Sequence, residues 1–106
     1  MVRVRDRNGI PVIEVSGDVD VFNVDEVFTS VRKAMPDDKP FVLSFECSPY
    51  CDSSGISSII GLIKERRQFA IVATGTVRRV METTQLHTLV PVAADVDEAL
   101  ERLQSG

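Results

Sequence analysis

The stretch FVLSFECSPYCDSSGISSIIGLIKERR, residues 41 to 67, decides the fold, because it predicts a strand, a loop and a helix in immediate succession. Residues 41 to 45 form an apolar run of the length that a buried strand requires. The tetrapeptide DSSG at 52 to 55 then supplies residue types that begin helices. Isoleucines follow at helical spacing, so we predict a central strand joined through this loop to a helix that ends near Arg67.

The two faces of this predicted helix differ in side-chain size. Four isoleucines at i, i+3, i+4 and i+7 form one wall of a core: Ile56, Ile59, Ile60 and Ile63. The opposite face, which ends at Glu65, carries small residues that we call the small-residue stripe: Ser54, Ser57, Ser58 and Gly61. An exposed helix face would ordinarily carry residues that favour helix more than Ser or Gly does. Since small side chains let another backbone approach closely, the stripe predicts a docking surface for a protein.

Ser54 lies at the start of the helix and of the stripe. Backbone N–H groups at a helix N-terminus lack partners within the helix, and they and the helix dipole accommodate a phosphate there. Phosphorylation adds about two negative charges. We therefore predict that Ser54 is a phosphorylation site, while the simpler alternative is that Asp52 or Ser53 only caps the helix.

Three segments together resemble the STAS-domain anti-sigma factor antagonists of bacteria. They are the strand and loop from 43 to 55, the turn VSGDVD at 15 to 20, and VRRVMETT at 77 to 84. The resemblance implies that a serine-kinase anti-sigma factor phosphorylates the second serine of the pair, here Ser54, and that a phosphatase acts on the product. It also implies that the unmodified form captures the kinase and frees the sigma factor, which regulates transcription. The chain departs from the family at Gln85, where many relatives have glycine, and at Cys51, which replaces a large aliphatic residue.

The stripe and the resemblance together define a set of predicted partner-binding residues. They are Asp20, Asn23, Asp52, Ser53, Ser54, Gly55, Ser57, Ser58 and Gly61. In this set we expect Asp52 to orient the loop and cap the helix. We expect Ser53 to present the neighbouring Ser54 to the partner. Asp20 and Asn23 precede the first helix, where a structural role in a turn and a cap is the alternative to partner contact.

The segments before residue 41 predict a hairpin followed by a helix. Alternating residues at 2 to 5 and 10 to 15 flank an Asn-Gly turn, as in an antiparallel hairpin. The next helix is expected to begin at Asn23, with Glu26 completing a capping box, and to end at Pro36. Phe22 and Val27 are spaced for a hydrophobic staple across its start.

The segments after residue 67 predict two more strands and two more helices. The apolar run 69 to 73 predicts a strand buried on both faces, and Pro91 places a short strand at 90 to 92 near a sheet edge. Helices are expected around 77 to 81 and after a capping box formed by Asp95 and Glu98. We therefore expect one α/β domain over residues 1 to 106, a STAS-like mixed sheet of about five strands with about four helices packed against it.

Composition restricts the class of protein. A chain of 106 residues with 43% hydrophobic content has room for a single domain. The net charge of −4 argues against a nucleic-acid surface, which would need clustered Lys and Arg, and the arginines at 66 and 67 and at 78 and 79 are no more than pairs. No apolar stretch reaches the roughly 18 residues of a membrane span, and the N-terminus lacks the pattern of a signal peptide. We expect a cytoplasmic protein that does not insert into a membrane.

Catalytic and metal-binding patterns are missing from the sequence. Cys47, Cys51 and the single histidine, His87, do not supply the four ligands of a zinc site, and we expect both cysteines to be free thiols. The nucleophile pattern G-x-S-x-G and the phosphate-binding pattern G-x-x-x-x-G-K-[ST] do not occur. We therefore expect no enzyme activity, no cofactor and no metal.

Two alternatives to an anti-sigma factor antagonist remain open on sequence. A receiver-like domain would be phosphorylated on Asp52, but it needs an acidic pair after the first strand and a lysine after the last. Asp18 and Asp20 instead follow the second predicted strand, and no lysine follows Lys64. The other alternative is a STAS-like docking subunit of a different assembly, such as a stress-signalling complex or a membrane transporter.

Overall fold

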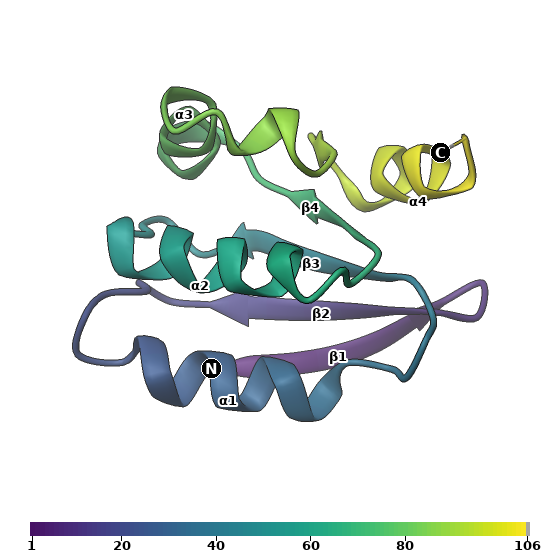
Figure 1. The fold of residues 1–106 in the computed structure, drawn as a ribbon, viewed down its shortest axis with the longest axis horizontal. Coiled ribbons are helices and arrows are strands. Elements are labelled where there is room, and N and C mark those ends of the chain that lie inside the picture. The colour runs from purple at the N-terminus through teal and green to yellow at the C-terminus, as the bar shows by residue number, and fades with distance from the viewer. Residues whose placement is uncertain (106) are drawn as a thin grey trace.

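Helices and strands alternate after an N-terminal hairpin in the computed structural model, which describes residues 1 to 105 (Figure 1). In chain order the elements are β1 (Val2–Arg7), β2 (Ile10–Ser16), α1 (Val24–Ala34), β3 (Phe41–Cys47), α2 (Ser53–Lys64), β4 (Phe69–Val72), α3 (Gly75–Thr83), the short 3-10 helix η1 (Leu86–Thr88), β5 (Val92–Ala93) and α4 (Val96–Ser105). The strands form one sheet in the order β1-β2-β3-β4-β5, in which β1 is antiparallel to β2 and the other pairs are parallel. The predicted fold class, a mixed five-stranded sheet with four α-helices, is confirmed.

Local sequence explains the hairpin and the end of the sheet. Asn8 and Gly9 join β1 to β2 with φ angles of 55° and 83°, the positive values that a two-residue hairpin turn requires. At the opposite edge, Pro91 immediately precedes β5, and its carbonyl accepts a hydrogen bond from the N–H of Ile71 at 2.8 Å. The strand β5 is at the edge of the sheet, as predicted, although it begins at Val92 and not at residue 90.

The sheet separates two clusters of buried side chains. Successive residues of a strand point to opposite faces, so Phe69 and Ile71 of β4 join the larger cluster and Ala70 and Val72 join the smaller one. The larger cluster contains the buried residues of α1, α2 and α3, and the smaller one contains those of α4. Three helices therefore pack on one face of the sheet, and α4 packs on the other.

The start of α1 differs from the prediction. Asn23 is the N-cap residue but makes no capping hydrogen bond with its side chain. Its Oδ1 instead accepts from the N–H of Asp20 at 3.0 Å, and its Nδ2 donates to the carbonyl of Asp18 at 2.8 Å. The staple is also wrong, because Phe22 is 94% exposed and does not pack on Val27. The side-chain amide of Asn23 is occupied by these hydrogen bonds within the turn. It is therefore not available to cap the first N–H groups of α1.

Two other helix boundaries refine the predictions. The helix α2 ends at Lys64, before Arg67, because Arg66 adopts a left-handed φ of 61° that ends the helical path. At the start of α4, Asp95 Oδ1 accepts from the N–H of Glu98 at 2.8 Å, which is the predicted cap. The Glu98 carboxylate reaches back to the N–H of Ala94 at 3.4 Å, one residue earlier than a capping box requires.

Candidate functional site

The loops β2–α1 and β3–α2 lie together at one end of the sheet (Figure 1). They follow neighbouring parallel strands, and the carboxyl ends of such strands meet at the same edge. Val19 joins the loops, since its N–H donates to the carbonyl of Tyr50 at 2.9 Å and its carbonyl accepts from the N–H of Asp52 at 3.0 Å. Segments about 30 residues apart in the chain therefore form one surface, which we call the two-loop surface.

Asp52 connects the two loops to α2. Its Oδ1 accepts hydrogen bonds from the N–H groups of Ser54 at 2.9 Å and Gly55 at 3.4 Å. Its Oδ2 accepts from the N–H of Val21 in the other loop at 3.2 Å. The predicted capping role of Asp52 is confirmed. The same carboxylate also fixes the β2–α1 loop, which the sequence did not predict.

The two serines occupy the first two positions of α2. Ser53 is exposed, whereas Ser54 is half-buried and follows it on the turn that Asp52 caps. Ser58, one turn later, donates its hydroxyl proton to the carbonyl of Ser54 at 3.1 Å. Ser54 therefore lies at the positive end of the helix dipole, where its N–H donates to the Asp52 carboxylate.

Gly55 lies beneath the surface. A Cβ atom at this position would be 2.3 Å from Cys51 Sγ and 3.2 Å from Val19 Cγ1. Real Cβ atoms do not approach so closely, so α2 can pack this near the loops only with glycine here. Of the predicted partner-binding residues, Gly55 is therefore buried and shapes the surface from below.

The rest of the small-residue stripe runs along α2 toward α1. Ser57 is exposed, and Ser58 and Gly61 are half-buried. A Cβ at Gly61 would lie 3.9 Å from Nη2 of Arg32 on α1, and Arg32 forms an ion pair with Glu65 at 2.7 Å. The stripe is therefore bordered at its end by an ion pair between α1 and α2. Sequence reasoning missed Arg32, because nothing in the local pattern links it to a residue 33 positions away.

Asp20 and Asn23 flank Val21, whose N–H donates to Asp52 at the start of the stripe. Asp20 Oδ1 accepts from the N–H groups of Phe22 at 2.9 Å and Asn23 at 3.2 Å, which closes the turn before α1. Both side chains are half-buried and take part in this turn. The structure thus places the predicted residues of both loops and of α2 on one contiguous part of the molecule.

Charge and exposed apolar groups distinguish the two-loop surface. Residues 16 to 31 and 48 to 63 contain no Lys, Arg or His, and their acidic residues are Asp18, Asp20, Asp25, Glu26 and Asp52. Three large apolar or aromatic side chains are also exposed: Val21 at 63%, Phe22 at 94% and Tyr50 at 46%. Sequence reasoning missed all three, and for Phe22 the staple pattern pointed to the opposite environment.

The cysteines have different environments. Both are free thiols, with Cys47 exposed and Cys51 buried in the larger cluster. Burial, together with the negative charge of Asp52, raises the pKa of the Cys51 thiol to about 11. Cys51 is therefore protonated at neutral pH and acts as a packing residue. Within residues 1 to 105, no group of three or more His, Cys, Asp or Glu side chains is arranged to hold a metal ion.

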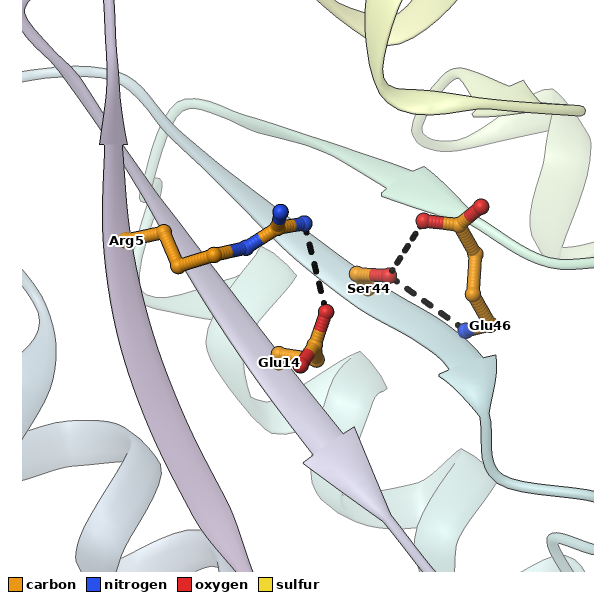
Figure 2. Close-up of polar contacts among 4 residues, drawn as sticks. All are labelled: Arg5, Glu14, Ser44 and Glu46. Carbon is orange, nitrogen blue, oxygen red and sulfur yellow. Dashed lines mark hydrogen bonds and ion pairs between the residues drawn. The ribbon is translucent and has the colours of Figure 1, made fainter.

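A second polar cluster lies away from the two-loop surface, among strands β1, β2 and β3 (Figure 2). Arg5 pairs with Glu14 at 3.2 Å, and the buried Ser44 hydroxyl contacts the Glu46 carboxylate at 3.4 Å. The N–H of Glu46 also donates to Ser44 Oγ at 3.3 Å. Arg5 and Glu14 pair between β1 and β2, whereas Ser44 is satisfied within β3 by Glu46, which accounts for a fully buried serine in the sheet.

Residues 1 to 99 match the STAS domain family, and the chain belongs to this family. Its fold is shared by an anti-sigma factor antagonist from Mycobacterium paratuberculosis, with a TM-score of 0.88, 22% identity and coverage of 98% of this chain and 93% of that one. The anti-sigma factor antagonist SpoIIAA in its unphosphorylated form gives a TM-score of 0.71 at 20% identity, over 100% of this chain and 98% of that one. A sulfate transporter family protein from Wolinella succinogenes also gives 0.71, at 16% identity, over 93% and 88% of the two chains.

No curated protein sequence matches the chain. At these sequence identities the structural similarities establish the fold and not the binding partner. The two-loop surface is the part of this chain that bears on the partner. In the described residues 1 to 105, no helix has the length and apolar character needed to cross a membrane.

Proposed function

We propose that this protein is a bacterial, cytoplasmic anti-sigma factor antagonist. Its unphosphorylated form binds a serine-kinase anti-sigma factor and releases the sigma factor, and phosphorylation of Ser54 switches this binding off. A phosphatase acting on phospho-Ser54 restores the binding form. The protein acts by binding, without catalysis of its own. Two of the similar structures are anti-sigma factor antagonists, and for one of them, SpoIIAA from Bacillus, a phosphorylated form is also similar in fold, which supports this role.

The observation that carries the proposal is the position of Ser54 on an acidic surface, at the N-terminus of α2. In the free protein, a phosphate on Ser54 lies in water near the positive end of the helix dipole, beside the Asp52 carboxylate that already accepts from the N–H groups of Ser54 and Gly55. A docked partner, in contrast, has to desolvate that phosphate or compensate its charge. Residues 16 to 31 and 48 to 63 contain no Lys, Arg or His, so the segments that carry Ser54 offer no basic side chain of their own to the phosphate. Phosphorylation therefore weakens docking more than it perturbs the fold.

The proposed docking surface comprises the residues that the two loops and α2 bring together. They are Asp20, Asn23, Asp52, Ser53, Ser54, Ser57, Ser58 and Gly61, with Gly55 supporting them from below. The small side chains along α2 permit close approach of a partner backbone. The ion pair between Arg32 and Glu65 marks the end of the surface.

A docking subunit of another assembly is the second candidate, and the similarity to a sulfate transporter family protein favours it. In that case the same surface binds a different component. The receiver-like alternative has less support, because Asp52 accepts hydrogen bonds from three backbone N–H groups and so serves as a structural cap.

The experiment uses each serine-kinase anti-sigma factor encoded in the same genome, purified separately and supplied with Mg-ATP. Intact mass spectrometry is expected to show one phosphate on the wild-type chain and on Ser53→Ala, and none on Ser54→Ala. Titration calorimetry is expected to show binding of the kinase by the unmodified chain and at least about tenfold weaker binding after phosphorylation.

Full phosphate incorporation into Ser54→Ala would exclude Ser54 as the acceptor. A phosphate that hydroxylamine releases would instead identify an aspartyl phosphate and favour Asp52. If none of the kinases binds or modifies the wild-type chain, the antagonist function is wrong and the docking-subunit function takes its place.

A further inference from the structure

We propose that Phe22, with Val21 beside it, is the apolar anchor of the docking surface. Its side chain inserts into an apolar pocket with a cationic rim on the anti-sigma factor. This inference rests on the proposed function and adds the chemistry of the partner's binding site. It also adds two residues that the sequence patterns did not assign to partner binding.

The exposure of Phe22 separates it from the other phenylalanines. The chain has five, and four of them are buried: Phe28, Phe41, Phe45 and Phe69. Phe22 is 94% exposed and Val21 is 63% exposed, so neither side chain contributes much burial to the folded chain. Burying a phenylalanine side chain is favourable, and an aromatic group left in water beside other exposed apolar groups marks an interaction site. A partner that covers Phe22 gains the burial that this fold leaves unused.

The backbone around Phe22 is fixed in place. The N–H of Phe22 donates to Asp20 Oδ1 at 2.9 Å, and the N–H of Val21 donates to Asp52 Oδ2 at 3.2 Å. Asn23, on the other side, bonds to Asp20 through both its side chain and its N–H. Because the loop backbone is already ordered, binding costs less conformational entropy than it would for a mobile loop. Aromatic residues, phenylalanine among them, are enriched in the cores of protein interfaces.

The anchor is joined to the predicted switch through one carboxylate. Asp52 accepts from Val21 with one oxygen and from Ser54 with the other. A phosphate on Ser54 places like charge beside the carboxylate that binds the N–H of Val21, the residue next to Phe22. The apolar anchor and Ser54 are therefore parts of one continuous surface, which a single partner can cover.

The charge of this surface indicates the charge of the partner's binding site. Asp18, Asp20, Asp25, Glu26 and Asp52 belong to the same two segments as Phe22 and Ser54, without a basic residue among them. Complementary potentials raise the association rate and exclude acidic partners. The pocket that accepts Phe22 must therefore be apolar at its centre and carry Lys or Arg at its rim.

The test measures binding of the kinase that modifies the wild-type chain, by titration calorimetry. Phe22→Ala is expected to weaken binding by about 30-fold or more, as for a hot-spot residue. Phe22→Leu keeps most of the apolar side chain and is expected to bind within about fivefold of wild type. The matched control is Leu89→Ala, which removes a side chain that is 60% exposed outside both loops, and it is expected to bind within about twofold of wild type. Thermal unfolding by circular dichroism is expected to be unchanged in all three variants, since both side chains are exposed.

The cationic rim has its own measurement. Affinity of the wild-type chain is expected to fall as sodium chloride rises from about 0.05 M to about 0.5 M, because salt screens attraction between exposed charges. If affinity does not depend on salt, the cationic rim is wrong.

The outcomes separate this inference from the proposed function. If the wild-type chain binds and Phe22→Ala binds equally well, the anchor is wrong while the antagonist function stands. If the wild-type chain binds none of the kinases, the antagonist function and the anchor for it both fail. If ultracentrifugation shows a dimer of this chain that Phe22→Ala dissociates, a second copy covers Phe22, and that result also overturns the proposal.

Discussion

At the residue scale, Gly55 and Cys51 show how one contact sets the distance between a helix and a loop. The sulfur of Cys51 fills the space directly beside the Gly55 Cα, where a Cβ would come within 2.3 Å. The Cys51 thiol and Val19 together occupy the space beneath α2. The position of Ser54 on the surface therefore depends on two neighbours that are themselves buried.

The first stability prediction concerns this pair. Gly55→Ala is expected to lower the free energy of unfolding by about 1–3 kcal/mol, because the added methyl group overpacks the site. The loss is expected to be smaller in a Cys51→Ala background, where the nearest atom has been removed and Val19 Cγ1 at 3.2 Å remains. Urea denaturation of the four proteins in this double-mutant cycle measures the coupling.

Gly61→Ala is the control for Gly55→Ala. Among residues 1 to 105, outside the backbone of α2 itself, the atom that a Cβ at Gly61 would meet is the end of the Arg32 side chain at 3.9 Å, so alanine fits and is expected to stabilise α2 by up to about 1 kcal/mol. An equal loss for Gly55→Ala in both backgrounds would show that the Cys51 contact does not limit the packing.

At the element scale, the connection from α3 to β5 contains a residue in an uncommon conformation. Gln85 has a φ of 62°, in the left-handed region that glycine adopts without strain, and it follows the end of α3 at Thr83. A glutamine in this conformation therefore has a conformational cost that glycine would not have. The N–H of Gln85 still donates to the carbonyl of Glu82 at 3.0 Å, which closes the end of the helix.

We expect Gln85→Gly to raise the free energy of unfolding by about 0.5–1 kcal/mol, since relief of the left-handed conformation outweighs the added freedom of the unfolded chain. Thr83→Gly, two residues earlier in the last turn of α3, is expected to lower it by a few tenths of a kcal/mol, because glycine weakens a helix. Thermal and urea unfolding of both variants give the comparison. A loss of stability in Gln85→Gly would show that the glutamine side chain itself stabilises this turn.

At the scale of the whole molecule, the sheet divides the protein into a face that carries the proposed docking helix and a face that packs α4. The larger cluster extends from the strands to Cys51 at the edge of the two-loop surface. Burial in this cluster gives the Cys51 thiol its raised pKa. The stability of the whole fold is therefore linked to the protonation of one group under the site.

The pH prediction follows from the direction of this shift. The pKa of Cys51 rises from an ordinary 9.0 to about 11 on folding. Between these values the unfolded chain loses the thiol proton while the folded chain keeps it, so rising pH favours the unfolded state. The contribution is fully present below pH 9, and about 2–3 kcal/mol is lost as pH rises to about 11.

Urea denaturation at about pH 8 and about pH 11 measures this loss. Other groups also titrate in this range, so the quantity to compare is the difference between variants. Cys51→Ala is expected to lose about 2–3 kcal/mol less than wild type over the interval, whereas Cys47→Ala, which lacks an exposed thiol, is expected to behave as wild type. Equal losses in all three proteins would show that the Cys51 thiol is not buried as described.

The sequence by itself determined the elements of this fold and their class. Asn8-Gly9 specified the hairpin, Asp52 the cap of α2, Pro91 the edge of the sheet and the isoleucine spacing the inner face of α2. Each of these features depends on backbone preferences or periodicity within a few residues, which are present in the sequence itself. The family resemblance rested on the same local segments, and the match over residues 1 to 99 confirms it.

Only the tertiary structure decided how the proposed site is assembled. The Asp52 carboxylate reaches Val21 from 31 residues away, Arg32 reaches Glu65 across 33 residues, and Gly55 meets Val19 beneath the surface. Phe22 had the spacing of a helix staple, yet the Asn23 side chain closes the preceding turn and Phe22 is left in water. Such contacts depend on how strands and helices pack at one end of the sheet. Packing between distant segments leaves no periodic signal in the sequence, so these residues could be assigned only after the chain was folded.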